Sequence, residues 1–401
     1  MAGIVVVGAG QAGAVLVAKL RAAGHDGAIT LIGDEPVPPY QRPPLSKAYL
    51  LGDMALERLF LRPASFYAEN DITLLTGRRV RAIDPGARRI TLDGRVLEYD
   101  QLALTTGAVP RRLPAALGGD LAGVHLVRSL ADVDRMAPEF TAGRRLVVVG
   151  GGYIGLEAAA VAVQRGLSVR MVEAAPRILQ RVAAAETSDH VRALHQRHGV
   201  EVIEGVPLTR LTGAEGRVTG AELADGRVLE ADFVICGIGV APDTALAEAA
   251  GLEIDNGIAT DALGRTSDPH VWAAGDCASF PLNGERLRLE SVQNAIDQAE
   301  CVALNILGKG AAYAPEPWFW SDQYDMKLQI AGLGNGHDRV VVRDGGAARS
   351  HWYFKGGRLI AVDAMNDPRA YMVGKRLLAM GRNPDAAALS DPGTDLKGLL
   401  R

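Results

Sequence analysis

The order of apolar and polar positions at the start of the chain is typical of a strand, a helix and a second strand. Residues 4–7 form a short apolar run, residues 12–23 carry small and apolar side chains at helical spacing, and residues 29–32 form another apolar run. Parallel strands need a crossover helix between them, so this order predicts a βαβ unit.

The same order returns near the middle of the chain. Apolar residues 146–149 precede a helical pattern at 154–164, and a second apolar run follows at 168–172. The two units start 142 residues apart, which is far longer than the period of a solenoid repeat. We therefore expect two separate nucleotide-binding domains in one chain.

Later patterns predict hairpins and a third domain. The Asp-Gly pairs at 93–94 and 225–226 lie between alternating apolar residues, which is a strong hairpin signal. From about Trp318 the chain holds three of its four tryptophans, a strand-like run at 339–343 and a helix-like run at 371–380. This segment predicts a third domain of mixed α/β structure.

The first glycine-rich turn, GAGQAG, has the spacing of a dinucleotide site. Gly8 permits a tight turn, Gly10 lets the backbone approach a pyrophosphate, and Gly13 lets the helix pack on the strand. The helix N-terminus supplies amide donors, and Asp34, 21 residues beyond Gly13, is the candidate partner of a ribose hydroxyl. With Asp276 after a later apolar strand and a glycine, this site is the candidate for FAD.

The second turn, GGGYIG, repeats the spacing with Gly150, Gly152 and Gly155. Glu173 ends the following apolar run, 18 residues beyond Gly155. A carboxylate there accepts a hydrogen bond from a ribose 2′-hydroxyl and repels a 2′-phosphate, so we expect NADH to be preferred over NADPH. Arg177 is the nearest following cation and is the one residue that argues for NADPH.

Composition excludes several classes of protein. The chain has 401 residues, an apolar fraction of 48% and a net charge of −4, which argues against a general nucleic-acid binder. The cysteines at 236, 277 and 301 form no C-x-x-C pair, so we expect a reducing compartment and no disulfide framework. The N-terminal apolar run lacks a basic leader and no run is long enough to span a membrane, so we expect a cytoplasmic protein.

A set of motifs resembles the FAD-dependent ferredoxin reductases that serve bacterial haem-thiolate monooxygenases and aromatic-ring dioxygenases. The set comprises GAGQAG, RPPLSKAYL, TTGAVPR, GGGYIGLEAA, GIGVAPD, AAGDCA, ESVQNA and PWFWSDQY. The resemblance implies an α/β, glutathione-reductase-like fold with two Rossmann-type domains and a C-terminal mixed α/β interface domain. It implies an FAD domain at 1–108 and 240–317, an NAD domain at 109–239 and a C-terminal domain at 318–401.

The resemblance also implies the residues that contact each cofactor. For FAD these are the first glycine turn and Ala12, Asp34, Lys47, Val80, Arg128, Asp276, Val292 and Trp320. For NAD they are Gly150, Gly152, Tyr153, Ile154, Gly155, Glu173, Gly237, Ile238 and Gly239.

One ion pair is predicted to serve the flavin. Arg42, Pro43 and Pro44 stiffen the loop that carries Lys47, because proline fixes its φ angle. A cation at the flavin edge favours the reduced, anionic form, and Glu157, one turn into the second fingerprint helix, is its candidate partner. The alternative is that both are solvated surface charges.

Hydride transfer depends on geometry, so no catalytic histidine and no metal are expected. His195 and His198 lie three residues apart in a helix-like segment and lack further ligands. We interpret them as part of a surface helix and not as a zinc site.

Electrons are expected to leave for a [2Fe–2S] ferredoxin and, indirectly, a terminal oxygenase. No nucleic acid or membrane partner is expected, and the chain is expected to be a monomer or a weak homodimer. From Phe319 onward there are 12 Lys/Arg and 9 Asp/Glu residues, an excess of +3 that attracts an acidic partner. The expected docking cations are Lys327, Arg339, Arg343, Arg286 and Arg288.

Alternative functions differ in the chemistry they need. A disulfide oxidoreductase or a peroxidase of this fold needs cysteine beside the flavin, and the RPPLSK segment has Lys47 instead. A rubredoxin reductase and a slow, NADH-sensing flavoprotein related to apoptosis-inducing factor share both fingerprints and stay open as alternatives.

Overall fold

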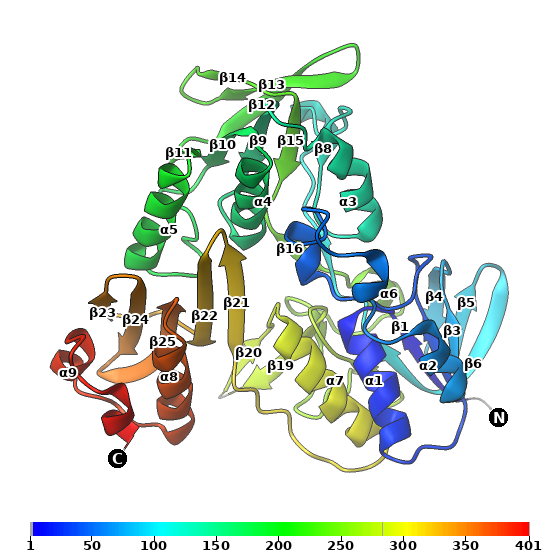
Figure 1. Ribbon diagram of the computed structural model, residues 1–401. Coiled ribbons are helices and arrows are strands. Elements are labelled where there is room, and N and C mark those ends of the chain that lie inside the picture. The colour runs from blue at the N-terminus through cyan, green and yellow to red at the C-terminus, as the bar shows by residue number, and fades with distance from the viewer. Residues whose placement is uncertain (1–2, 283, 401) are drawn as a thin grey trace. The chain divides into compact units, whose positions relative to one another are not determined.

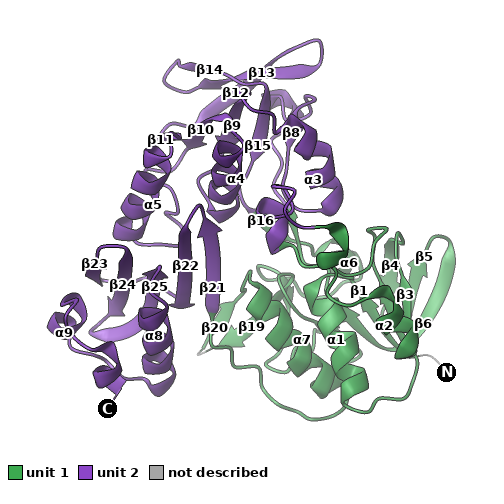
Figure 2. Cartoon of the chain, in the orientation of Figure 1, with its two compact units in different colours: residues 1–42, 55–109, 240–317 green, residues 43–54, 110–239, 318–401 purple. Residues whose placement is uncertain are grey.

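The computed structural model describes residues 3–282 and 284–400, and they divide into two compact units (Figures 1 and 2). The first unit comprises 1–42, 55–109 and 240–317, and the second comprises 43–54, 110–239 and 318–401. No helix in the described part of the chain has the length and apolar character needed to cross a membrane.

The first unit is built on a mainly parallel sheet. Its elements are β1 (Gly3–Val7), α1 (Gln11–Ala22), β2 (Ile29–Ile32), α2 (Ala64–Glu69), β3 (Ile72–Leu75), β4 (Val80–Asp84), β5 (Arg89–Leu92), β6 (Arg95–Leu104), β7 (Ala108–Pro110), β16 (Val240–Pro242), α6 (Ala245–Ala249), β17 (Ile258–Ala259), β18 (Val271–Ala273), β19 (Ala278–Leu282), β20 (Glu285–Leu287) and α7 (Val292–Ile306). The strand order is β3-β2-β1-β6-β5-β4, and β18 pairs with β6.

The predicted βαβ unit forms the centre of this sheet. Strands β1 and β2 are parallel and in register from Ile4 and Ile29, and α1 connects them. Helices α1 and α7 lie side by side over one face, where they share an apolar core with β1 and β2 (Figure 1). The predicted hairpin joins β5 and β6, and its turn residues Asp93 and Gly94 both have positive φ, as a type I′ turn requires.

The second unit contains a parallel sheet, a small antiparallel sheet and the C-terminal domain. Its elements before residue 240 are a 3₁₀ turn η1 (Pro43–Ser46), β8 (Val124–His125), α3 (Leu130–Met136), β9 (Arg145–Val149), α4 (Tyr153–Gln164), β10 (Ser168–Glu173), α5 (Ala185–Arg197), β11 (Glu201–Glu204), β12 (Leu208–Ala214), β13 (Arg217–Leu223), β14 (Val228–Glu230) and β15 (Phe233–Cys236). The parallel order is β11-β10-β9-β15-β8, and β12-β13-β14 form an antiparallel sheet.

The C-terminal domain is an antiparallel sheet covered by a helix. It comprises β21 (Trp318–Gln323), β22 (Met326–Gly332), β23 (Arg339–Gly345), β24 (Ala348–Lys355), β25 (Arg358–Met365), α8 (Pro368–Met380) and α9 (Ala386–Ser390). The strand order is β21-β22-β25-β24-β23, and Trp352 is fully buried in the core under α8. The third domain is therefore mixed α/β, as predicted.

Candidate functional site

The first glycine turn has room for a ligand at one glycine only. A Cβ on Gly8, whose φ is +113°, would lie 2.2 Å from the carbonyl oxygen of Thr105, and one on Gly13 would lie 2.0 Å from that of Gly8. A Cβ on Gly10 would meet nothing within 4 Å. Two glycines therefore pack strand against helix, and Gly10 faces open space at the start of α1, which has no side-chain cap. These features fit a pyrophosphate.

Two carboxylates follow the strand of this turn. Gly33 cannot carry a side chain, since its Cβ would lie 2.5 Å from that of Ala9, and the first acid is displaced to the exposed Asp34. Glu35 is engaged within the protein: Tyr40 Oη and Arg42 Nη2 each donate to it at 2.6 Å. Sequence reasoning assigned no partner to Arg42, although the two acidic residues that follow β2, Asp34 and Glu35, could have indicated one.

The second glycine turn repeats the geometry of the first. A Cβ on Gly150, whose φ is +106°, would lie 2.3 Å from the oxygen of Gly237, and one on Gly155 would lie 2.3 Å from that of Gly150. A Cβ on Gly152 would meet nothing within 4 Å, and α4 begins without a side-chain cap. Gly237 thus packs directly against this turn, and it is one of the residues that the family resemblance implies as NAD contacts.

Glu173 is fixed against the second turn by two backbone amides. Its Oε2 accepts from the Gly151 amide and its Oε1 from that of Ala175, both at 2.7 Å. Arg177 donates to the Ala184 carbonyl and the Ser188 hydroxyl at the start of α5. The guanidinium of Arg177 is therefore bound at the start of α5, and the carboxylate of Glu173 is held at the end of β10.

The remaining predicted cofactor residues divide between the two units. The first unit contains Ala12 in α1, Val80 in β4, Asp276 after β18 and Val292 at the start of α7, where Ser291 caps the helix. The second unit contains Lys47, Arg128, Tyr153, Ile154, Ile238, Gly239 and Trp320.

The predicted ion pair is present and its carboxylate is buried. Lys47 Nζ lies 2.7 Å from Glu157 Oε2, and the two side chains are 19% and 5% exposed. Ser46 Oγ donates to Oε2 at 2.6 Å, and Ser321 Oγ donates to Oε1 at 2.7 Å. Glu157 is therefore not a solvated surface charge: three donors compensate its burial, as a buried carboxylate requires.

Two of these donors were missed by sequence reasoning. Ser46 directly precedes Lys47 in the RPPLSK motif, so adjacency to a candidate cation was a signal for it. Ser321 lies 164 residues from Glu157, and no local pattern links them.

Strand β21 has two faces of different character. Phe319 packs on Tyr153 with ring centroids 4.9 Å apart, and Ser321 on the same face reaches Glu157. On the opposite face Trp318 and Trp320 lie with their ring centroids 5.5 Å apart. Alternation along the strand thus separates the residues that contact α4 from the aromatic pair.

The interpretation of His195 as a surface residue is wrong. His195 is fully buried, and burial lowers its pKa to about 4. Its Nε2 lies 2.8 Å from Gln323 Oε1, and its Nδ1 lies 3.1 Å from Tyr324 Oη. The polar face of α5 is covered by the C-terminal domain, which the sequence of the helix does not reveal. His198 is exposed and stacks on Tyr324.

The three cysteines are free thiols and none is placed for disulfide chemistry. Burial raises the pKa of Cys236 to about 12, and burial also raises the pKa of Cys277 and Cys301. A thiol in this state is a poor nucleophile at neutral pH. Redox chemistry through cysteine is therefore not what these side chains provide.

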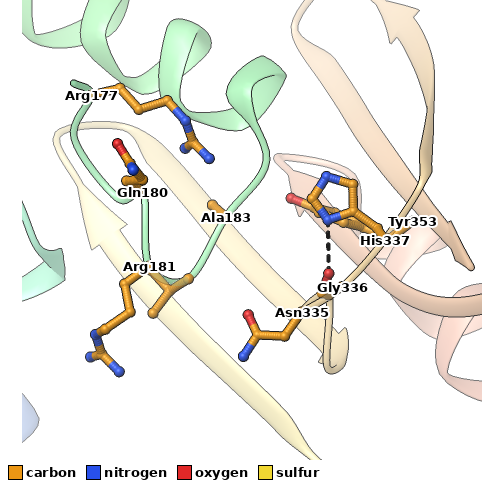
Figure 3. Close-up of a pocket in the computed structure, with 10 residues that line it drawn as sticks. Arg177, Gln180, Arg181, Ala183, Asn335, Gly336, His337 and Tyr353 are labelled. Carbon is orange, nitrogen blue, oxygen red and sulfur yellow. Dashed lines mark hydrogen bonds between the residues drawn. The ribbon is translucent and has the colours of Figure 1, made fainter. Parts of the chain in front are cut away.

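A separate cavity of about 140 Å³ lies in the second unit (Figure 3). The segment before α5 lines one wall with Arg177 and Arg181, and the β22–β23 loop lines the other with Asn335 and His337. None of the predicted cofactor residues lines it. It is distinct from both glycine turns.

Two glycine turns of one geometry, each on a helix N-terminus, define an oxidoreductase that works with two dinucleotides. Residues 2–299 match the pyridine nucleotide-disulphide oxidoreductase family, and residues 318–400 match the reductase C-terminal family. The chain belongs to the ferredoxin reductases of this family, as the sequence resemblance predicts. It is an NAD(H)-dependent oxidoreductase, and FAD and NAD are its cofactors.

Individual relatives resemble the chain over its full length. Rhodocoxin reductase of Rhodococcus erythropolis is 44% identical across 98% of this chain and 93% of that protein. A ferredoxin–NAD(P)(+) reductase of Sphingomonas sp is 45% identical across 97% and 94%. The crystal structure of a covalent putidaredoxin reductase–putidaredoxin complex matches with a TM-score of 0.96 at 40% identity, covering 100% of this chain and 98% of that one.

Proposed function

We propose that this protein is an NADH:ferredoxin oxidoreductase that passes electrons from NADH through FAD to a [2Fe–2S] ferredoxin of a bacterial oxygenase system. The observation that carries the proposal is the pair of equivalent turns, in which Gly10 and Gly152 alone face open space. Two dinucleotides bind. Cys236 and Cys277 are buried free thiols whose pKa burial raises, which favours electron transfer from the flavin directly to the acceptor without a disulfide intermediate.

The first turn holds FAD and the second holds NADH in this proposal. Gly10 and the first amides of α1 receive the FAD pyrophosphate, and Asp34 binds its ribose; Ala12, Val80, Asp276 and Val292 complete the FAD contacts of the first unit. Glu173 accepts from the ribose 2′-hydroxyl of NADH and disfavours a 2′-phosphate, because the amides of Gly151 and Ala175 hold the carboxylate in place.

FAD, when bound, takes two electrons from NADH as a hydride and supplies them singly to the one-electron iron–sulfur acceptor. The protein contributes binding and electrostatics. The ammonium of Lys47, held by Glu157, favours the reduced and negatively charged flavin, and Arg128 and Trp320 complete the flavin surroundings.

Fewer cations are available to attract a ferredoxin than the count of charges in the sequence predicts. Arg343 donates to the backbone oxygens of residues 389, 391, 392 and 394, and Arg288 pairs with Glu290 at 2.7 Å. Arg286 donates to the carbonyl of Ser279 at 2.7 Å. All three cations are engaged within the protein, although Arg286 is also exposed. Lys327 and Arg339 are exposed on the C-terminal domain. We assign ferredoxin attraction to those two.

Stopped-flow reduction tests the proposal. NADH is expected to reduce the bound flavin rapidly, and the reduced enzyme is expected to reduce an added [2Fe–2S] ferredoxin in catalytic cycles. Rubredoxin serves as the comparison acceptor and ferricyanide as the acceptor that needs no docking. Faster reduction of rubredoxin would favour a rubredoxin reductase, and slow reduction of every protein acceptor would favour an NADH sensor.

A further inference from the structure

A continuous chain of hydrogen bonds runs from the Lys47–Glu157 pair into the C-terminal domain. Ser321 Oγ donates to Glu157 Oε1 at 2.7 Å, and Gln323 Nε2 donates to Ser321 Oγ at 3.1 Å. Gln323 Oε1 lies 2.8 Å from His195 Nε2, and Tyr324 Oη lies 3.1 Å from His195 Nδ1. This series of hydrogen bonds therefore joins helices α4 and α5 to strand β21.

All hydrogen bonds of this series donate in one direction, from Tyr324 toward Glu157. An amide oxygen only accepts, so the bond to Gln323 requires a proton on His195 Nε2. Since burial lowers the pKa of His195 to about 4, the ring is neutral near pH 7 and its Nδ1 accepts from the Tyr324 hydroxyl. The series of donations from Tyr324 ends on the carboxylate of Glu157.

Burial makes this arrangement sensitive to the loss of a member. Glu157 is 5% exposed, Ser321 and His195 are fully buried, and Gln323 is 1% exposed. At such sites a hydrogen bond is electrostatically stronger than in water, and an unpaired polar atom is costly. The hydroxyl of Ser321 is the donor to Oε1, so its removal leaves that oxygen to compete for the Lys47 ammonium.

We propose that Ser321, oriented by Gln323, is a positioning residue that sets how much of the Lys47 charge is available to the flavin. Ser321 satisfies one oxygen of Glu157, so the carboxylate binds the ammonium through the other oxygen alone. Without Ser321 the carboxylate neutralises Lys47 more completely, and the reduced flavin loses stabilisation. This inference rests on the proposed function, in which Lys47 acts on bound FAD.

The test measures the reduction equilibrium of the bound flavin. Holoenzyme with Ser321→Ala is equilibrated with a reference dye. The ratio of reduced to oxidised flavin at fixed dye potential is expected to fall about 3- to 10-fold, the range for one ordinary hydrogen bond, because the lost bond acts on the flavin only through Lys47. Gln323→Leu, which leaves the Ser321 hydroxyl without its orienting donor, is expected to lower the ratio less. Ser350→Ala removes another buried serine of the same sheet and is the matched control.

A double-mutant cycle separates positioning from general loosening. In the Glu157→Gln background, Ser321→Ala is expected to change the ratio less than twofold, whereas a merely structural effect would persist there. A second readout is acylation of Lys47, measured by mass spectrometry against Lys19, which pairs with Glu300 at 2.8 Å. Tighter pairing in Ser321→Ala is expected to slow acylation of Lys47 and not of Lys19.

Each outcome has one meaning. An unchanged flavin ratio in both Ser321→Ala and Gln323→Leu, or an equal fall in the Glu157→Gln background, overturns the positioning role. If Ser321→Ala does not fold, Gln323→Leu decides the matter by the same two readouts. Failure of NADH to reduce the wild-type flavin would instead contradict the proposed function, and that experiment does not involve these variants.

Discussion

The ammonium of Lys47 and the carboxylate of Glu157 lie 2.7 Å apart, in a pair whose acidic member is almost wholly buried. Removing one partner of a buried pair costs more than removing both, because the remaining charge is left without compensation. Because Ser46 and Ser321 still donate to Glu157, Lys47→Met is expected to lower the free energy of unfolding by about 1–3 kcal/mol, the cost of one lost partner at a buried polar group. The double variant with Glu157→Gln is expected to recover part of the loss. Urea unfolding measures both. Lys19→Met, in the more exposed pair with Glu300, should change stability by less than about 1 kcal/mol.

Substitutions at the packed Gly8 and at the open Gly10 of the first turn are expected to have different effects, on stability and on flavin binding respectively. Gly8→Ala forces a methyl group against the Thr105 carbonyl at a positive φ and is expected to destabilise the fold by about 1–3 kcal/mol. Gly10→Ala meets no protein atom and is expected to leave the melting temperature unchanged while the flavin content falls. Flavin absorbance and thermal unfolding distinguish the two. Full flavin content in Gly10→Ala would show that its open space is not the pyrophosphate site.

Glu173 is expected to set the preference for NADH. Glu173→Ala removes the acceptor for the ribose hydroxyl and is expected to lower kcat/KM for NADH by at least about 10-fold, the lower limit for one hydrogen bond to a charged group. The value for NADPH is expected to stay constant or rise, because the repulsion is lost as well. Steady-state reduction of ferricyanide measures both, with the exposed Glu201→Ala on β11 as control. Equal losses with both nucleotides would refute this role.

Ferredoxin docking is expected to depend on salt and on two exposed cations. Lys327→Glu and Arg339→Glu should each raise the apparent KM for an acidic ferredoxin several-fold at low ionic strength, since rim charges govern association. Flavin reduction by NADH and turnover with ferricyanide should not change. Arg358→Glu, at another exposed position of the same domain, is the control. An equal rise of the apparent KM in all three variants would show that only the net charge of the protein, and not a docking site at Lys327 and Arg339, governs the association.

Stability is expected to fall in mild acid because of His195. Its pKa is lowered from 6.5 to about 4 by burial, so between these values only the unfolded chain binds the proton. The unfolded state is then favoured as the pH falls, by at most about 3 kcal/mol at pH 4. Urea unfolding at pH 5 and pH 7 is expected to show a smaller difference in His195→Gln than in wild type. The exposed His198→Gln should keep the wild-type difference; if it does not, burial is not the cause.

The sequence was most informative where its signals are local. Both βαβ units, the Asp93-Gly94 hairpin and the strand–turn–helix spacing follow from periodicity and glycine chemistry within about 30 residues. The Lys47–Glu157 pair was found because a proline-fixed loop and a helix position each limit where their charges can lie.

Contacts between distant segments were not predictable in this way. The burial of His195 comes from Gln323 and Tyr324, which are more than 100 residues away, and no property of α5 itself signals it. Likewise, Arg343 looks like a surface cation in sequence, but its guanidinium fastens the C-terminal segment by four backbone carbonyls. Tertiary packing overrides the local pattern at both positions.

The alternation of β21 constrains how this chain can vary in length. Trp320 and Ser321 are neighbours in sequence and lie on opposite faces, so a one-residue deletion within β21 before Trp320 would exchange the two faces over the rest of the strand. Trp320 would then lie in the place of Phe319 against Tyr153, Ser321 would replace Trp320 in the aromatic pair, and Asp322 would bring a second carboxylate opposite Glu157. Length changes are therefore expected to be tolerated in the 307–317 linker but not within β21, and libraries that shuffle C-terminal domains should place their junctions before residue 318.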